Sequence, residues 1–116
     1  MYVRNLSAAL NTKTMSVCIV ESDVELFQVI TDDVIVYFTT MWCGPCREIS
    51  PHYARAAEQY PNFKFAKVDV GYLEDTRDVS AIPTFRVYRG GEVVEELLGA
   101  DLGALDSLLK KHCSFN

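Results

Sequence analysis

The sequence predicts an α/β domain in which a mixed sheet of five strands is flanked by four helices. Segments typical of strands and of helices alternate in the order β α β α β α β β α, which favours parallel strands joined by right-handed crossovers. Residues 34–40 (VIVYFTT) form a mostly apolar run, typical of a strand buried on both faces of a sheet. Two later strand segments meet at Gly90-Gly91, a hairpin signal that adds an antiparallel edge.

Two shorter elements precede the buried run. Residues 16–20 (SVCIV) are rich in β-branched side chains, which predicts a strand. Ser22 is followed three residues later by Glu25, and this capping-box pattern predicts a helix that ends near Thr31. The run at 34–40 is then the second strand of the sheet.

A long helix and a third strand come next. Apolar residues at helical spacing predict a helix from about Gly44 to Tyr60, and Pro51 inside it is expected to cause a kink. Residues 63–70 (FKFAKVDV) alternate between apolar and polar side chains, which predicts a strand. We expect a short helix within residues 72–79.

A hairpin and a last helix complete the domain. The segment 84–99 (TFRVYRGGEVVEELLG) predicts two strands on either side of the two glycines. Asp101 is suited to cap a final helix. The apolar face of that helix is formed by leucines at helical spacing: Leu102, Leu105, Leu108 and Leu109.

The composition indicates one domain with its own core. Of the 116 residues, 49% are hydrophobic, which suffices for a core without metal or disulfide staples. We expect a single domain over residues 16–116, preceded at 1–15 by an extension that is either flexible or a targeting segment. The net charge is −5 and no cluster of Lys and Arg is present, so neither nucleic acid nor an anionic membrane is an expected partner. A monomer is the simplest expectation.

The start of the sequence bears on location. Residues 1–14 lack the continuous apolar stretch of a secretory signal peptide, so we expect a cytoplasmic protein. Import into an organelle is left open, because the same residues carry Arg4 and Lys13 and no acidic side chain.

Cys43 and Cys46 lie where the buried strand gives way to the long helix. The first N–H groups of a helix have no helical partner and carry the positive end of its dipole, so they stabilise a thiolate at Cys43. Cys46 follows one turn later on the same face, within disulfide reach. Pro45 suits the first helical position. Two thiols that can close and reopen a small ring form a redox couple.

Two other interpretations of this pair are open. A zinc site would need two more Cys or His ligands at suitable spacing, and Cys18 and Cys113 are isolated. A pair of inert structural cysteines is the second alternative, although a sharp strand–helix junction is an unusual place for one. We expect no metal and no cofactor beyond the redox-active cysteines.

Three motifs together resemble the thioredoxin family. They are MWCGPC at 41–46, the proline within the long helix, and AIPTF at 81–85. The resemblance runs from about Val17 to His112 and includes KVDV at 67–70 and the glycine before the last helix. It implies the thioredoxin fold and a dithiol/disulfide cycle that reduces protein disulfides.

The resemblance also implies a role for each matching residue. Cys43 would attack a substrate disulfide, and Cys46 would resolve the resulting mixed disulfide. Pro83 matches a cis-proline that packs against the active disulfide and leaves the Ile82 backbone free to pair with an extended substrate. The surrounding groove would be formed by Trp42, Gly44, Pro45, Ile82, Pro83, Gly99 and Ala100.

Tyr37 departs from the family pattern. Thioredoxins usually have a buried aspartate at this position, accompanied by a lysine that Lys67 matches. A phenol is a poor proton acceptor at neutral pH. We therefore hypothesise that water or the departing Cys43 thiolate accepts the proton of Cys46. We also hypothesise that Tyr37 makes the fold more stable, because no carboxylic acid has to be buried at this position. The alternative is that Tyr37 packs in the core with its hydroxyl bonded locally.

The function that the sequence favours is a thiol–disulfide oxidoreductase that acts on disulfide-containing client proteins. A flavin-dependent thioredoxin reductase is the expected electron donor. Two alternatives remain: an adaptor with the thioredoxin fold that binds partners with low redox turnover, and an oxidase or isomerase module of a secretory compartment.

Overall fold

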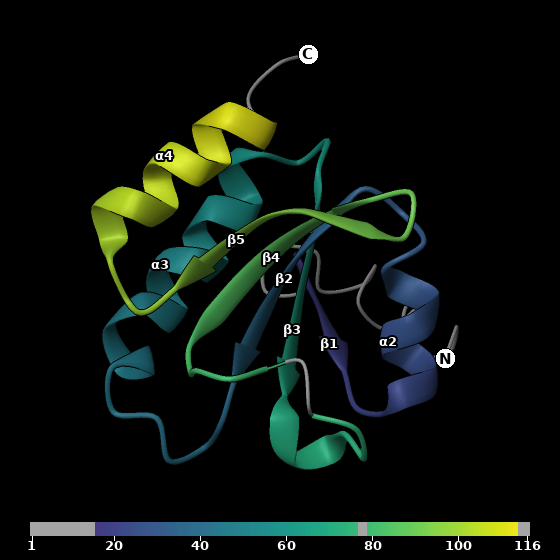
Figure 1. Ribbon diagram of the computed structural model, residues 1–116. Helices are drawn as coiled ribbons and strands as arrows, with labels where there is room; N and C mark the ends of the chain where they lie inside the picture. The colour runs from purple at the N-terminus through teal and green to yellow at the C-terminus, as the bar shows by residue number, and fades with distance from the viewer. Residues whose placement is uncertain (1–15, 77–78, 114–116) are drawn as a thin grey trace.

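The computed structural model describes residues 16–76 and 79–113, and its five strands form one mixed sheet in the order β1-β3-β2-β4-β5. β1 and β2 run parallel to β3, whereas β4 runs antiparallel to both β2 and β5. The strands are β1 (Val17–Val20), β2 (Val34–Thr39), β3 (Lys64–Asp69), β4 (Thr84–Arg89) and β5 (Glu92–Leu98). The predicted five-stranded mixed sheet is therefore confirmed (Figure 1).

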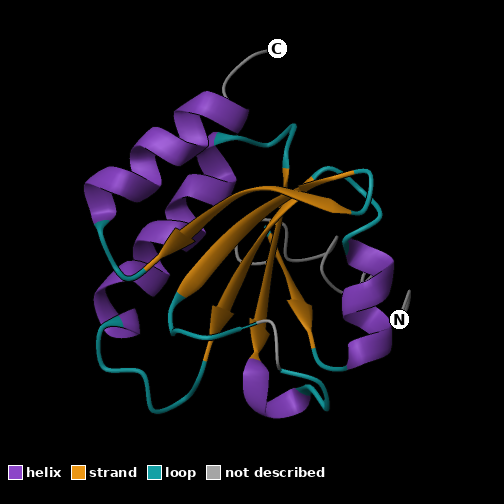
Figure 2. Ribbon diagram, in the orientation of Figure 1, coloured by secondary structure: helices purple, strands orange, loops and turns teal. Residues whose placement is uncertain are grey.

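Three α-helices and one 3₁₀ turn accompany the strands in the described residues, and the last of these helices follows β5. They are α2 (Asp23–Val29), α3 (Cys46–Gln59), η1 (Val70–Tyr72) and α4 (Leu102–Cys113). Helices α3 and α4 cover one face of the sheet and α2 covers the other, so the domain has three layers (Figure 2). None of the described helices is long and apolar enough to cross a membrane.

The prediction of a short helix within residues 72–79 is wrong. The described chain instead forms the 3₁₀ turn η1, and Leu73 after it is extended, with a ψ of 141°. The carboxylate of Asp69 accepts the N–H of Gly71 at 2.8 Å, and such a local side-chain bond favours a tight turn over a helix. Residues 77–78 and the predicted extension at 1–15 lie outside the described residues, so the interpretation of the extension stays a prediction.

Strand β2 is the centre of the fold. It pairs with β3 on one side and β4 on the other, and all six of its residues are buried. Ile35 and Tyr37 face α3 and α4, whereas Val36 and Phe38 face α2. The continuous apolar run in the sequence follows from this double burial, because neither face of the strand meets water.

Tyr53 joins α3 to the sheet. Its hydroxyl donates toward the carbonyl oxygens of Ile35 in β2, at 3.0 Å, and Ala66 in β3, at 2.7 Å. Its ring packs edge-on against Phe65, with the ring centroids 5.3 Å apart. Burial raises the pKa of Tyr53 well above its ordinary value, because the phenolate would lose its hydration. This side chain therefore fixes the distance between α3 and the sheet.

We expect Tyr53→Phe to lower the free energy of unfolding by about 1–2 kcal/mol, because the substitution keeps the ring and removes only the buried hydrogen bonds. Urea unfolding followed by circular dichroism measures the change. Tyr72→Phe is the matched control, because Tyr72 is 56% exposed and its hydroxyl can bond to water. Equal stability of the two variants would contradict the assigned role of Tyr53.

Candidate active site

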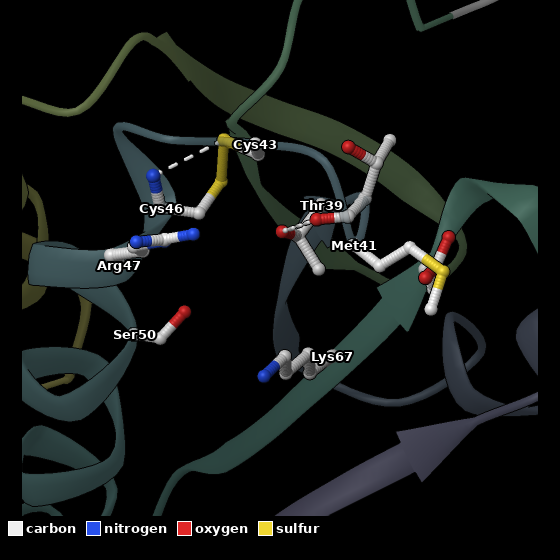
Figure 3. Close-up of a pocket in the computed structure, with 9 residues that line it drawn as sticks. Thr39, Met41, Cys43, Cys46, Arg47, Ser50 and Lys67 are labelled. Carbon is white, nitrogen blue, oxygen red and sulfur yellow. Dashed lines mark hydrogen bonds between the residues drawn. A yellow bond between two sulfur atoms is a disulfide. The ribbon is translucent and has the colours of Figure 1, made fainter.

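Cys43 and Cys46 form a disulfide at the carboxyl end of β2. The S–S distance is 2.10 Å and the Cα atoms are 5.3 Å apart. The disulfide reach that the spacing predicts is confirmed. Cys43 and Cys46 are both in the wall of a cavity between α3 and the ends of β2 and β3 (Figure 3).

A sequence of tight turns carries the chain from β2 into α3. The N–H of Cys43 bonds to the Thr40 carbonyl at 3.3 Å, and the N–H of Arg47 bonds to the Gly44 carbonyl at 3.0 Å. Helix α3 begins at Cys46 rather than at the predicted Gly44, because Pro45 occupies the N-cap position. Both cysteines are therefore held at the first turn, where backbone N–H groups lack helical partners.

The backbone of Cys46 is directed at the sulfur of Cys43. The N–H of Cys46 donates to Cys43 Sγ at 3.1 Å, as the dashed line in Figure 3 shows. When the disulfide is reduced, this donor is already placed for a Cys43 thiolate, and the dipole of α3 adds to its effect. The thiolate stabilisation expected at Cys43 thus has a specific donor.

The two sulfurs differ in exposure. Cys46 is only 4% exposed, whereas Cys43 is partly exposed and follows two exposed residues, Met41 and Trp42. Gly44 and Pro45 are also exposed. A large reactant can reach Cys43 from solvent, while Cys46 is reached only from Cys43 or through the cavity.

The residues assigned to the groove lie in separate loops. The Ile82–Pro83 peptide bond is cis, as the resemblance implies. The carbonyl of buried Pro83 accepts the N–H of Gly99 at 2.8 Å, so the loops at 81–83 and 99–100 are joined. Gly99 has a φ of 98°, which favours glycine. Trp42 and Ala100 are exposed, and their part in a groove stays a prediction.

The cavity beside the disulfide has a volume of about 310 Å³, and polar and apolar surface both contribute to its lining. Two basic side chains, one carboxylate and three hydroxyl groups contribute to its wall. The lining residues are Thr39, Thr40, Met41, Cys43, Cys46, Arg47, Ser50, Lys67 and Asp69. Such a wall can hold water next to Cys46.

Tyr37 lies beneath this cavity in the core. Its ring stacks on Phe85, with the centroids 4.8 Å apart, and its hydroxyl is 2.7 Å from the hydroxyl of Ser50. The ammonium of Lys67 lies 5.7 Å from the centroid of the Tyr37 ring. The core packing and the local hydrogen bond that the alternative predicts for Tyr37 are both present, and the hypothesis about the proton acceptor of Cys46 stays a prediction. Sequence reasoning missed Ser50, although its position four residues after Cys46 places it on the same side of α3.

The remaining cysteines are separate from the disulfide. Cys113 is buried, and desolvation raises the pKa of its thiol to about 12. Cys18 is partly buried in β1. In the part of the chain that the structure describes, no group of three or more His, Cys, Asp or Glu side chains could hold a metal ion.

The chain matches a known protein family over most of its length. The family model described as Thioredoxin matches residues 17–111. The chain belongs to the thioredoxin family. It is therefore a thiol–disulfide oxidoreductase, and the Cys43–Cys46 disulfide is its redox centre. Thioredoxins act on protein disulfides and are typically reduced by a thioredoxin reductase.

Several known thioredoxins are similar to the chain. Thioredoxin of Coprinus comatus is 45% identical over 83 residues, which cover 67% of this chain and 78% of that protein. Thioredoxin 1 of Plasmodium falciparum is 38% identical over 101 residues, which cover 83% and 97%. The TPR repeat-containing thioredoxin TDX of Arabidopsis thaliana is 40% identical over 84 residues, 70% of this chain, and the match spans only 22% of its length.

Solved structures give the same result. A Plasmodium falciparum thioredoxin superimposes with a TM-score of 0.78 and 40% identity, covering 83% of this chain and 99% of that one. Thioredoxin O1 from Arabidopsis thaliana in the oxidised state gives a TM-score of 0.74 and 30% identity, covering 84% and 98%. The thioredoxin fold predicted from the motifs is confirmed.

We expect the four thiols of the reduced protein to react with iodoacetamide at very different rates at pH 7. Cys43 should react faster than free cysteine, because the backbone N–H and the helix start stabilise its thiolate. Cys113 should remain unmodified until the protein is unfolded, because burial keeps its thiol protonated. Timed quenching followed by peptide mass spectrometry measures each rate.

The unfolded protein in urea is the control for the alkylation experiment, and there all four cysteines should react alike. A Cys43 in the folded protein that is no more reactive than free cysteine would remove the chemical basis of the site.

Proposed function

We propose that the chain reduces disulfides of client proteins, with Cys43 as the nucleophile and Cys46 as the resolving thiol. The observation that carries this proposal is the unequal placement of the two sulfurs. Cys43 is partly exposed and its sulfur accepts a backbone hydrogen bond, whereas Cys46 is buried. The Cα atoms of the two cysteines are 5.3 Å apart. This arrangement suits one thiol for attack on a large partner and the other for an intramolecular reaction.

The proposed reaction proceeds in two exchanges. The Cys43 thiolate attacks one sulfur of the client disulfide, so a Cys43–client bond forms and the other client sulfur leaves as a thiolate. The Cys46 thiolate then attacks Cys43, which forms the Cys43–Cys46 disulfide and releases the second client thiolate. Two electrons pass from the protein to the client, and the client thiolates take up protons from water.

A flavin-dependent thioredoxin reductase is the proposed electron donor that reopens the Cys43–Cys46 bond. The cytoplasm is the proposed location, since its reducing glutathione pool suits this direction of electron flow. We propose a monomer as the working form. Exposed Met41 and Trp42 next to Cys43 would supply apolar contact to unfolded or extended client segments, and the Ile82 backbone would supply hydrogen bonds.

Insulin reduction tests the proposal. With dithiothreitol as the electron source, the wild-type protein should accelerate precipitation of the insulin B chain, and Cys43→Ser should return the rate to the background. Cys18→Ser is the matched control and should keep the wild-type rate, because Cys18 lies in β1, away from the disulfide. A coupled assay with NADPH and a thioredoxin reductase then tests the electron donor.

Cys46→Ser tests the division of roles, because this variant should attack clients but fail to release them. Non-reducing electrophoresis of a lysate should show covalent complexes that dithiothreitol dissolves, and Cys43→Ser should show none. An absence of insulin reduction together with stable non-covalent client binding would favour the adaptor instead.

A further inference from the structure

Ser50 occupies a position from which it can act on the buried sulfur of the redox couple. It follows Cys46 by one helical turn on α3, and both residues are in the wall of the cavity (Figure 3). Residues four apart on a helix have neighbouring side chains. The Ser50 hydroxyl is therefore placed below Cys46, on the side away from the exposed face of the disulfide.

The hydrogen bond between Tyr37 and Ser50 fixes the direction in which the Ser50 hydroxyl proton points. Tyr37 is completely buried, and the Ser50 oxygen, at 2.7 Å, is the only hydrogen-bond partner of its hydroxyl in the described residues. A buried donor is rarely left without an acceptor, so Tyr37 donates and Ser50 accepts. The Ser50 side chain makes no other hydrogen bond to a described residue, so its own O–H is available to the cavity.

The charge around the cavity favours an anion at the sulfur. Arg47 and Lys67 line the cavity, and neither makes an ion pair with a described residue. Among the described residues of the lining, Asp69 is the only carboxylate, so two positive charges there face one negative charge. Figure 3 shows the polar ends of Ser50 and Lys67 directed into the same space. A nearby cation stabilises a thiolate.

We propose that Ser50, oriented by Tyr37, donates a hydrogen bond to the Cys46 thiolate during resolution, and that Lys67 stabilises the same charge across the cavity. The inference rests on the proposed function, because it concerns the second of the two exchanges. The Cys46 thiol releases its proton to water in the cavity. Its thiolate then forms a bond to Cys43 Sγ, and the Cys43–client bond breaks with its electron pair going to the client sulfur.

The first exchange does not depend on this hydroxyl pair. The Cys43 thiolate has a different donor, the backbone N–H of Cys46 at 3.1 Å. The two exchanges therefore rely on separate donors, one from the backbone and one from side chains. A substitution at Ser50 should slow resolution and leave the initial attack unchanged.

The reaction of the reduced protein with DTNB separates the two exchanges. Attack by Cys43 releases one thionitrobenzoate and leaves a mixed disulfide, and attack by Cys46 then releases a second one. The first phase depends on the DTNB concentration, whereas the second is intramolecular and does not. Reaction of Cys18 also depends on DTNB concentration, so it cannot be mistaken for the second phase. Stopped-flow absorbance between pH 5 and 9 measures both phases.

We expect Ser50→Ala to slow the second phase about tenfold at neutral pH and to raise its pH midpoint by about one unit, as for loss of a hydrogen bond to a charged group. The first phase should keep its rate. Lys67→Gln should change the second phase in the same direction. Ser107→Ala is the matched control, because Ser107 is an exposed serine of α4, outside the cavity lining.

Ser50→Ala alone leaves the buried Tyr37 hydroxyl without its partner and is expected to destabilise the fold. The double variant Tyr37→Phe with Ser50→Ala removes both hydroxyl groups and avoids this cost. It should fold and still show the slow second phase. A second phase in the double variant with the wild-type rate and pH midpoint would overturn the proposal.

The same experiment keeps this proposal distinct from the proposed function. If the proposed function fails, the wild-type protein shows no second phase or does not reduce insulin. If only the role of Ser50 fails, the wild-type protein shows both phases and the variants match it.

Discussion

The geometry of the active site depends on the burial of β2 at the centre of the sheet. This strand is paired on both edges and covered on both faces, so its carboxyl end has one position relative to the rest of the domain. The chain leaves the sheet there and turns at once into α3 through the hydrogen bonds of Thr40 and Gly44. Cys43 is thus held by a backbone that cannot shift without disturbing the sheet, and its geometry is preorganised for reaction.

The two sulfurs of the couple have opposite environments within one helical turn. Cys43 meets solvent and a backbone donor, and Cys46 meets the core and a polar cavity. Tyr37 links the core to the wall of the cavity, because its ring stacks on Phe85 while its hydroxyl contacts that of the lining residue Ser50. The position that holds a buried acid in the usual family pattern is filled here by a neutral aromatic residue. Negative charge at the site can therefore develop on sulfur without repulsion from a carboxylate at this position.

Much of the site could be predicted from the sequence, because its signals are local. The spacing of Cys43 and Cys46 limits their separation, and a continuous apolar run before them predicts a buried strand and its end. The 3₁₀ turn η1 was not predicted, because an Asp69 side chain decides the conformation there and residues 72–79 carry too few apolar positions for a reliable period. Ser50 was missed for a different reason. A serine on a helix is common, and it becomes informative only when Tyr37, 13 residues away, is seen to contact it.

Cys113 shows how the fold treats a sulfur outside the couple. It is packed among the side chains of the α3 and α4 face, and burial holds its thiol in the protonated form. Peroxide oxidises thiolates far more readily than thiols, so Cys113 is shielded from the route to sulfenic acid. As a result it is also a poor partner for exchange with the working disulfide. At this position the sulfur belongs to a small apolar side chain that packs in the core.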